Sequence, residues 1–142
     1  MNAQTCARAA GIEPGTFNAW IRRGLIPGMT IGVSGRRQNI DLDTATRVAI
    51  FAELFRLGIP AGYASMFVTI PIDRHAKRLI VMKYETNDEA FLSGKPLAST
   101  LESDDQIPEY LRSRFPDGPP TYVVINVERL AERMRRAEKG ES

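Results

Sequence analysis

The spacing of glycines and prolines in residues 5–58 constrains the fold more than any other feature of this sequence. Small helix-forming residues fill positions 3–10, and Gly11 follows them where a helix commonly ends. A proline opens a second predicted helix, residues 14–23, at the one helical position that tolerates a missing backbone N–H. Gly24 follows that helix. This part of the chain therefore predicts two short helices joined by a tight turn.

The second predicted helix has two unlike faces. Phe17, Trp20 and Ile21 are spaced i, i+3 and i+4, which places them on one apolar face that a core would bury. The polar residues that lie off this face are Thr16, Asn18, Arg22 and Arg23. The helix is therefore expected to pack by one side and to present hydroxyl, amide and guanidinium groups on the other.

Two short β segments, residues 30–33 and 38–40, flank the sequence Ser-Gly-Arg-Arg. A glycine-containing turn between β segments predicts a hairpin. Arg36 and Arg37 lie at its tip, where packing requires no arginine. A solvated loop is the alternative.

A long amphipathic helix is predicted next, capped by Asp43 and ended by Gly58. Its apolar face, which would close over Phe17 and Trp20, comprises Ala45, Val48, Ala49, Phe51, Ala52 and Phe55. A shorter helix restarts after Pro60. Helix, turn, helix and basic hairpin is the layout of a winged helix-turn-helix, whose second helix enters the DNA major groove.

This stretch resembles the DNA-binding domain of the MerR family and the related excisionase-type winged helices. The matching residues are Ala7-Arg8, Gly11-Ile12, Thr16-Phe17, Trp20, Arg23-Gly24-Leu25-Ile26-Pro27, Gly35-Arg36-Arg37, Asp41-Leu42 and Leu54-Phe55-Arg56-Leu57-Gly58. Four positions depart from the family pattern. Glu13 replaces the usual helix cap, Asn18 and Ala19 replace a basic residue and a tyrosine, and Asn39 replaces an aromatic residue.

The resemblance implies a dimer that binds palindromic sites on double-stranded DNA. It implies that Thr16, Asn18 and Arg22 face the groove, with Arg23 also at the DNA. Although Asn18 departs from the family pattern, an asparagine side chain can read adenine through two hydrogen bonds. The residues expected to contact phosphates are Arg8, Arg36 and Arg37. Phosphate contacts set register and affinity and do not select the sequence.

The charges of the chain are unevenly distributed. Residues 1–65 hold seven basic and four acidic side chains, a net charge of +3, whereas the remainder has a net charge of −1. Every basic residue in the first part is arginine, whose planar fork suits phosphates and guanine edges. This bias favours a nucleic-acid partner.

Residues 71–142 predict a second, small α/β region after a DNA-binding domain of residues 1–70. Strands are expected at residues 77–85 and 121–126, a short helix at 108–114 and a final helix from Val127 towards Gly140. Two strands and one helix bury too little to be stable alone, so this region is expected to pack on a second subunit or on the DNA-binding domain. Dimerisation is its expected role. The predicted fold class is α+β.

Few residues suggest catalysis or metal binding. Cys6 lies in a small-residue helix and favours a buried filler, and His75 lies in a charged linker. The acidic cluster Glu102, Asp104 and Asp105 favours a solvated loop, and the arginines near Arg135 an exposed helix face. We therefore expect no enzyme activity, no metal and no cofactor.

No apolar run is long enough to span a membrane, and no secretory signal is evident, so a cytoplasmic protein without a membrane partner is expected. The favoured function is a sequence-specific transcriptional regulator, with RNA polymerase as a further partner. A phage-related DNA-architectural protein, either an excisionase or the DNA-recognition subunit of a packaging motor, remains open. A third option is that the C-terminal part binds a small molecule or a protein.

Overall fold

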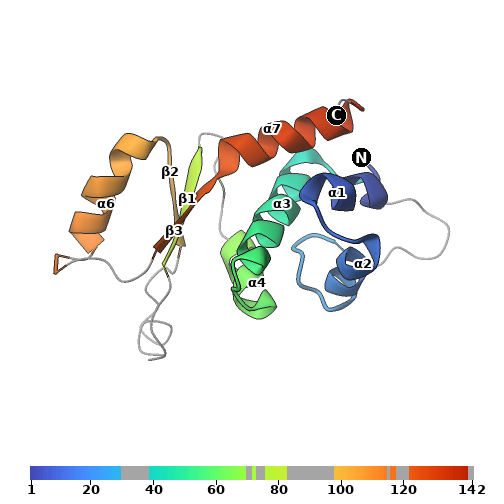
Figure 1. Ribbon diagram of the computed structural model, residues 1–142, viewed down its shortest axis with the longest axis horizontal. Coiled ribbons are helices and arrows are strands. Elements are labelled where there is room, and N and C mark those ends of the chain that lie inside the picture. The colour runs from blue at the N-terminus through green and yellow to red at the C-terminus, as the bar shows by residue number, and fades with distance from the viewer. Residues whose placement is uncertain are drawn as a thin grey trace. The chain divides into compact units, whose positions relative to one another are not determined.

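The computed structural model describes residues 1–29, 39–69, 72, 76–82, 98–114, 116–117 and 122–140. The chain is α+β and divides into two compact units (Figure 1). Unit 1 comprises Met1–Thr69 together with Arg129–Ser142, and unit 2 comprises Ile70–Glu128. The sequence analysis placed the first boundary at residue 70 and the last helix in the second part. The structure instead groups that helix, from Arg129 onward, with the N-terminal helices.

Unit 1 is helical, and its first two helices lie where they were predicted. Helix α1 spans Ala3–Ala10, α2 spans Pro14–Arg22, and three residues join them. Gly11 has a φ of 74°, the left-handed conformation that glycine adopts without strain, and it caps the carbonyls at the end of α1. Gly11 thus ends the first helix and Pro14 begins the second, with a short turn between them.

Helix α3 spans Leu42–Arg56. The predicted N-cap, Asp43, was wrong by two residues. Asp41 is the N-cap, because its Oδ1 accepts a hydrogen bond of 2.7 Å from the backbone N–H of Thr44. Asp43 lies in the first turn and pairs with Arg47 at 3.1 Å. Both candidates are aspartates, so the residue type does not show which one is the N-cap. The backbone conformation decides it.

Helix α3 is the centre of unit 1. The sequence predicted one broad apolar face, yet Ile50 and Leu54 are fully buried as well as Phe51. Helices α1 and α4 (Ala61–Thr69) both pack on α3, which leaves little of its circumference to solvent. The buried residues of α3 are Ala45, Thr46, Val48, Ala49, Ile50, Phe51, Ala52 and Leu54.

Helix α7, Val127–Glu138, contributes its later turns to unit 1. Its Met134 is fully buried. Two ion pairs tie this part of the helix to unit 1, one from Arg133 to Glu53 of α3 at 3.9 Å and one from Glu138 to the Met1 amine at 4.0 Å. The final helix therefore completes the helical unit.

Unit 2 contains a three-stranded antiparallel sheet, where the sequence analysis expected two strands. The strands are β1 (Arg78–Met82), β2 (Ala98–Leu101) and β3 (Tyr122–Asn126), in the order β2-β1-β3. The missed strand is the short sequence ASTL, which lacks the apolar content that marks the other two. It pairs with β1, with Leu79 opposite Thr100.

The two strands and the short helix that the sequence analysis expected in unit 2 are present, with the first strand described as far as Met82. The central strand buries three successive residues, Leu79, Ile80 and Val81, as expected for a strand apolar on both faces. A 3-10 turn, η1 (Asp104–Gln106), follows β2 and leads directly into helix α6 (Ile107–Arg114).

Candidate nucleic-acid interface

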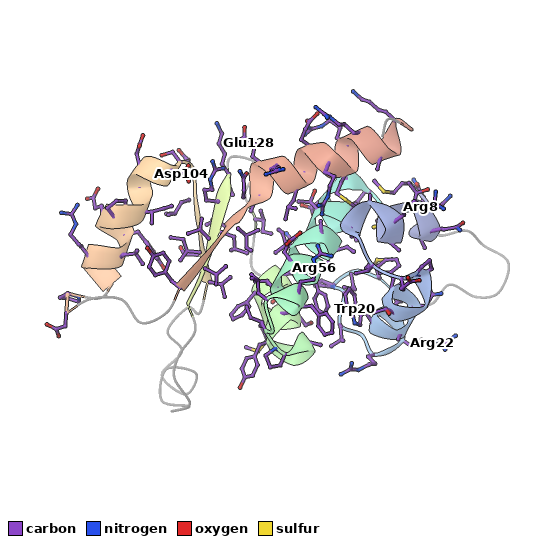
Figure 2. All side chains as sticks on the ribbon, in the orientation of Figure 1. Arg8, Trp20, Arg22, Arg56, Asp104 and Glu128 are labelled. Carbon is purple, nitrogen blue, oxygen red and sulfur yellow. The ribbon has the colours of Figure 1, made fainter. Side chains whose placement is uncertain are left out.

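The side of α2 that faces the core anchors this helix on α3. Phe17, Trp20 and Ile21 are 1%, 3% and 8% exposed, which confirms the predicted apolar face. The Trp20 ring centroid lies 4.5 Å from that of Phe51 and 5.3 Å from that of Phe55, both in tilted or edge-on geometry. Figure 2 shows Trp20 between α2 and α3. The orientation of α2 is therefore set by aromatic packing on its inner side.

The polar residues that the sequence analysis singled out lie off the buried face of α2, with Arg23 at its C-cap. Thr16, Asn18, Arg22 and Arg23 are all exposed. Glu13, at the N-cap, makes no side-chain hydrogen bond to the helix, so the first turn of α2 has no side-chain cap. Arg8 is exposed in the last turn of α1. The structure thus places five of the seven predicted contact residues on the surface of α1, of α2 and of the residue that caps α2. Figure 2 labels two of them, Arg8 and Arg22.

Arg8, Arg22 and Arg23 differ in their partners from most of the other arginines whose side chains the structure describes. Within the described residues none of these three forms an ion pair. A guanidinium without a carboxylate partner keeps its full capacity to bind phosphate or a base edge. These three side chains are consequently the candidates for an external anion.

The remaining two predicted contact residues, Arg36 and Arg37, lie outside the described residues, as does the predicted hairpin up to Gln38. The chain is described again from Asn39. The Met1 amine donates hydrogen bonds to Asn39 Oδ1 at 3.0 Å and to the Ile40 carbonyl at 2.9 Å, and Ile40 N–H donates to the Met1 carbonyl at 2.8 Å. Asn39 and Ile40, the last two residues of the predicted second β segment, are therefore held against the start of α1 and do not form a strand in the structure.

Two arginines in the same part of the chain have internal roles. Arg47 pairs with Asp43 and donates from Nη1 to the Val68 carbonyl at 2.5 Å. Arg56 donates from Nη1 to the carbonyls of Ala10 and Gly11. The exclusive use of arginine in residues 1–65 is thus not only a signature of nucleic-acid binding, because a forked donor also suits clusters of backbone carbonyls.

Grouping the chain into its two units sharpens the charge asymmetry. Unit 1 holds twelve Lys and Arg against seven Asp and Glu, a formal net charge of +5. Unit 2 holds seven against ten, a net charge of −3. The division after residue 65 gave a smaller contrast because it assigned the arginine-rich last helix to the acidic half. The basic character therefore belongs to the unit that carries α2.

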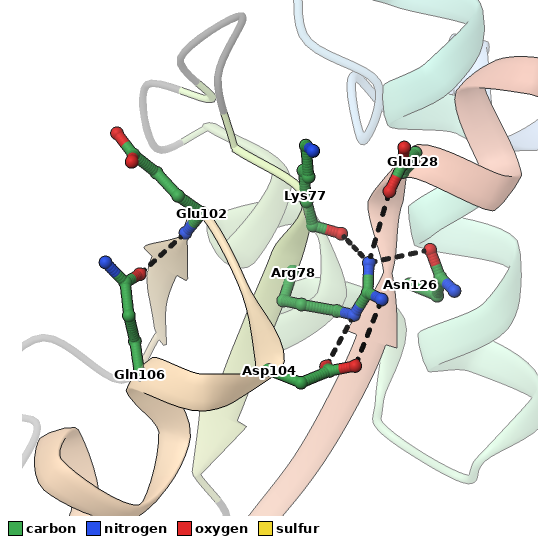
Figure 3. Close-up of polar contacts among 7 residues, drawn as sticks. All are labelled: Lys77, Arg78, Glu102, Asp104, Gln106, Asn126 and Glu128. Carbon is green, nitrogen blue, oxygen red and sulfur yellow. Dashed lines mark hydrogen bonds and ion pairs between the residues drawn. The ribbon is translucent and has the colours of Figure 1, made fainter.

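The principal polar cluster of unit 2 is internal (Figure 3). Arg78 Nε and Nη2 donate to the two carboxylate oxygens of Asp104 at 2.7 and 3.2 Å. Its Nη1 donates to the Lys77 carbonyl and to Asn126 Oδ1 and lies 3.7 Å from Glu128. These hydrogen bonds hold the pKa of the Asp104 carboxyl below its usual value. Asp104 is exposed, as predicted for a solvated acidic cluster, and its pairing with Arg78 also joins η1 to β1.

Cys6 is fully buried, as the sequence analysis predicted, and burial raises the pKa of its thiol to about 12. His75 lies outside the described residues. No group of three or more His, Cys, Asp and Glu side chains suited to a metal ion occurs in the described part of the chain.

On α7, Arg135 and Arg136 are exposed and both pair with Glu132. No helix in the described ranges is long and apolar enough to cross a membrane.

Arg56 is the residue of this region whose role sequence reasoning missed. Its sequence neighbourhood, Leu54-Phe55-Arg56-Leu57-Gly58, entered the resemblance only as a helix end. The contact it makes, with a turn 45 residues earlier, has no local signal in the sequence.

Compared with models of known protein families and with curated proteins, the chain matches none.

Proposed function

We propose that this protein is a sequence-specific DNA-binding transcriptional regulator that acts as a dimer through a MerR-like winged helix-turn-helix. In this proposal α2 enters the major groove and the predicted hairpin contacts the flanking backbone. The observation that carries it is the division of α2 into two sides. One side is anchored by Trp20, and the other presents Thr16, Asn18 and Arg22 to solvent.

The residue types on the outer side of α2 support recognition of bases. An asparagine side chain can donate to N7 of adenine and accept from the N6 amino group, and an arginine can donate to O6 and N7 of guanine. Asn18 and Arg22 lie four residues apart, hence one above the other on the helix surface. Both are exposed, and Arg22 has no ion pair among the described residues. We assign base contacts to these two side chains and to Thr16.

Phosphate contacts are assigned to Arg8, Arg23, Arg36 and Arg37. The net charge of +5 on unit 1 supports this assignment, because a basic unit attracts duplex DNA irrespective of its sequence.

The acidic unit 2 is assigned to the dimer contact. Strands β2 and β3 are the outer strands of its sheet in the described part of the chain, and an outer strand can pair with a second copy. We further propose that RNA polymerase is a partner of this protein and that the protein is cytoplasmic.

The decisive experiment is selection of bound fragments from random and genomic DNA by the full chain, followed by selection with Asn18→Ala. The expected result is a palindromic site near gene starts, with relaxed preference at one position per half-site in the variant. Each lost base contact should cost roughly 1–3 kcal/mol of binding free energy. Absence of any enriched sequence would contradict the proposal.

The same selection separates the alternative function. Clustered repeats beside an integration or packaging site would favour a phage-related architectural protein over a regulator. The dimer is tested by sedimentation of the full chain, free and bound to a palindromic duplex. A truncation after Thr69 is unsuitable for this purpose, because it would also remove the turns of α7 that belong to unit 1.

A further inference from the structure

The turn between α1 and α2 is held from outside by one side chain of α3. Arg56 Nη1 donates hydrogen bonds to the Ala10 carbonyl at 3.1 Å and to the Gly11 carbonyl at 3.2 Å. Its Nη2 forms an ion pair with Glu53 at 2.6 Å. Figure 2 shows Arg56 on α3. Every one of these partners lies in unit 1.

The end of α1 needs such a donor. The last four carbonyls of an α-helix lack partners within the helix. At α1 the backbone N–H groups of Gly11 and Ile12 satisfy the carbonyls of Arg8 and Ala7. Arg56 donates a hydrogen bond to the Ala10 carbonyl and another to the Gly11 carbonyl in the turn. Its positive charge also lies at the negative end of the helix dipole.

The fit between the two partners is close. A Cβ added at Gly11 would lie 3.0 Å from Arg56 Nη1, and the φ of 74° at Gly11 already disfavours a side chain. A lysine has a single nitrogen, so it cannot place one nitrogen at the two carbonyls and a second at the Glu53 carboxylate, as the Arg56 guanidinium does. The residue types at positions 11 and 56 are therefore matched to each other.

We propose that Arg56 is a positioning residue for DNA binding, which orients α2 by fixing the turn that precedes it. The inference rests on the proposed function. Phe55, the neighbouring residue on α3, contacts Trp20 of α2, so the last turn of α3 determines both the start and the inner side of α2. Arg56 acts through this geometry and neutralises no phosphate.

The test compares Arg56→Ala, Arg56→Lys and wild type on the selected duplex, with Glu53→Gln and Arg112→Ala as controls. Glu53→Gln removes the carboxylate charge that pairs with Arg56 and Arg133 and keeps the two carbonyls that accept from Arg56. Arg112 is an exposed arginine of unit 2. Affinity is measured over a range of salt concentrations, at a temperature where circular dichroism shows each variant folded. Exchange of the Gly11 and Ile12 amides is measured without DNA.

We expect Arg56→Ala to weaken binding roughly tenfold, as is typical when charge-assisted hydrogen bonds are lost. The slope of log K against log salt should stay unchanged, since no phosphate contact is removed. Arg56→Lys should be intermediate, the two controls should stay within about twofold of wild type, and the turn amides should exchange faster in Arg56→Ala. Where Arg56→Ala does not fold, Arg56→Lys provides the comparison.

Two results would overturn this inference alone while wild type still binds. Unchanged affinity of a folded Arg56→Ala variant would exclude a positioning role. A slope reduced by about one unit would assign Arg56 to a phosphate instead. Failure of the wild type to bind any duplex would remove the proposed function, and the inference with it.

Discussion

Arg78 of unit 2 and three arginines of unit 1 have opposite roles. In unit 2, Arg78 is enclosed by two carboxylates, an amide and a carbonyl, and it holds a turn against the sheet. In unit 1, Arg8, Arg22 and Arg23 lie on the surface of α1 and α2 without an ion pair in the described part of the chain. The comparison shows that an arginine is informative about function only once its partners are known.

The two units also differ in what holds them together. Unit 1 is a helical core built around α3 and a tryptophan–phenylalanine cluster, with a net charge of +5. Unit 2 is a small sheet with a charged cluster at one edge and a net charge of −3. Apolar burial should therefore dominate the stability of unit 1, and exposed ion pairs should contribute little to that of unit 2.

The largest expected effect is that of Trp20→Ala on unit 1. Replacing a buried tryptophan by alanine should cost about 3–5 kcal/mol of unfolding free energy, since it leaves a cavity beside Phe51 and Phe55. Urea titration followed by circular dichroism measures the loss. The matched control in unit 2 is Tyr122→Ala, whose side chain is 41% exposed and should matter much less. Equal losses for both variants would break the contrast between the units.

Removal of a surface arginine from α2 should affect binding and leave folding unchanged. Arg22→Ala is expected to lower the free energy of DNA binding by roughly 1–3 kcal/mol, because a base contact is lost. Fluorescence anisotropy of the selected duplex measures this change. Arg112→Ala, an exposed arginine of unit 2, should bind as wild type does. A comparable loss for both variants would show that net charge, and not position, governs the affinity.

A smaller effect separates the two aspartates at the start of α3. Asp41→Ala should destabilise unit 1 by about 1 kcal/mol, since Asp41 caps the helix. The pKa of Asp41 is lowered by the hydrogen bond from Thr44 N–H, so its contribution should disappear as the pH falls through that lowered pKa. Asp43→Ala should cost less. Thermal unfolding of both variants at neutral and acidic pH decides between them.

The smallest effect is expected at the charged cluster of unit 2. Asp104→Asn should slightly lower the unfolding midpoint of this unit at neutral pH, because the ion pair with Arg78 is weakened. The pKa of Asp104 is lowered in the folded protein, so the contribution is complete above the usual pKa of about 3.9 and is lost below the lowered value. Asp105→Asn is the adjacent control. A pH-independent difference would rule out the ion pair as its cause.

Local signals were sufficient wherever the backbone alone decides the structure. Pro14 and Gly11 predicted the boundaries of α1 and α2 within one residue, and the i, i+3, i+4 spacing predicted which side of α2 is buried. The strand β2 was missed because Ala98–Leu101 has no apolar alternation, and its pairing with β1 comes from a distant segment. The same holds for Asp104, whose partner Arg78 lies 26 residues away.

The order of glycines, prolines and apolar residues was enough to establish the short helices, their turn and the polar outer side of α2. These features depend on interactions within a few residues, which the sequence contains in full. The partners of the arginines, the return of α7 to the N-terminal unit and the contact of Arg56 with the α1–α2 turn depend on which distant segments pack together. Long-range packing brings those groups within hydrogen-bonding distance, and no spacing along the chain encodes it.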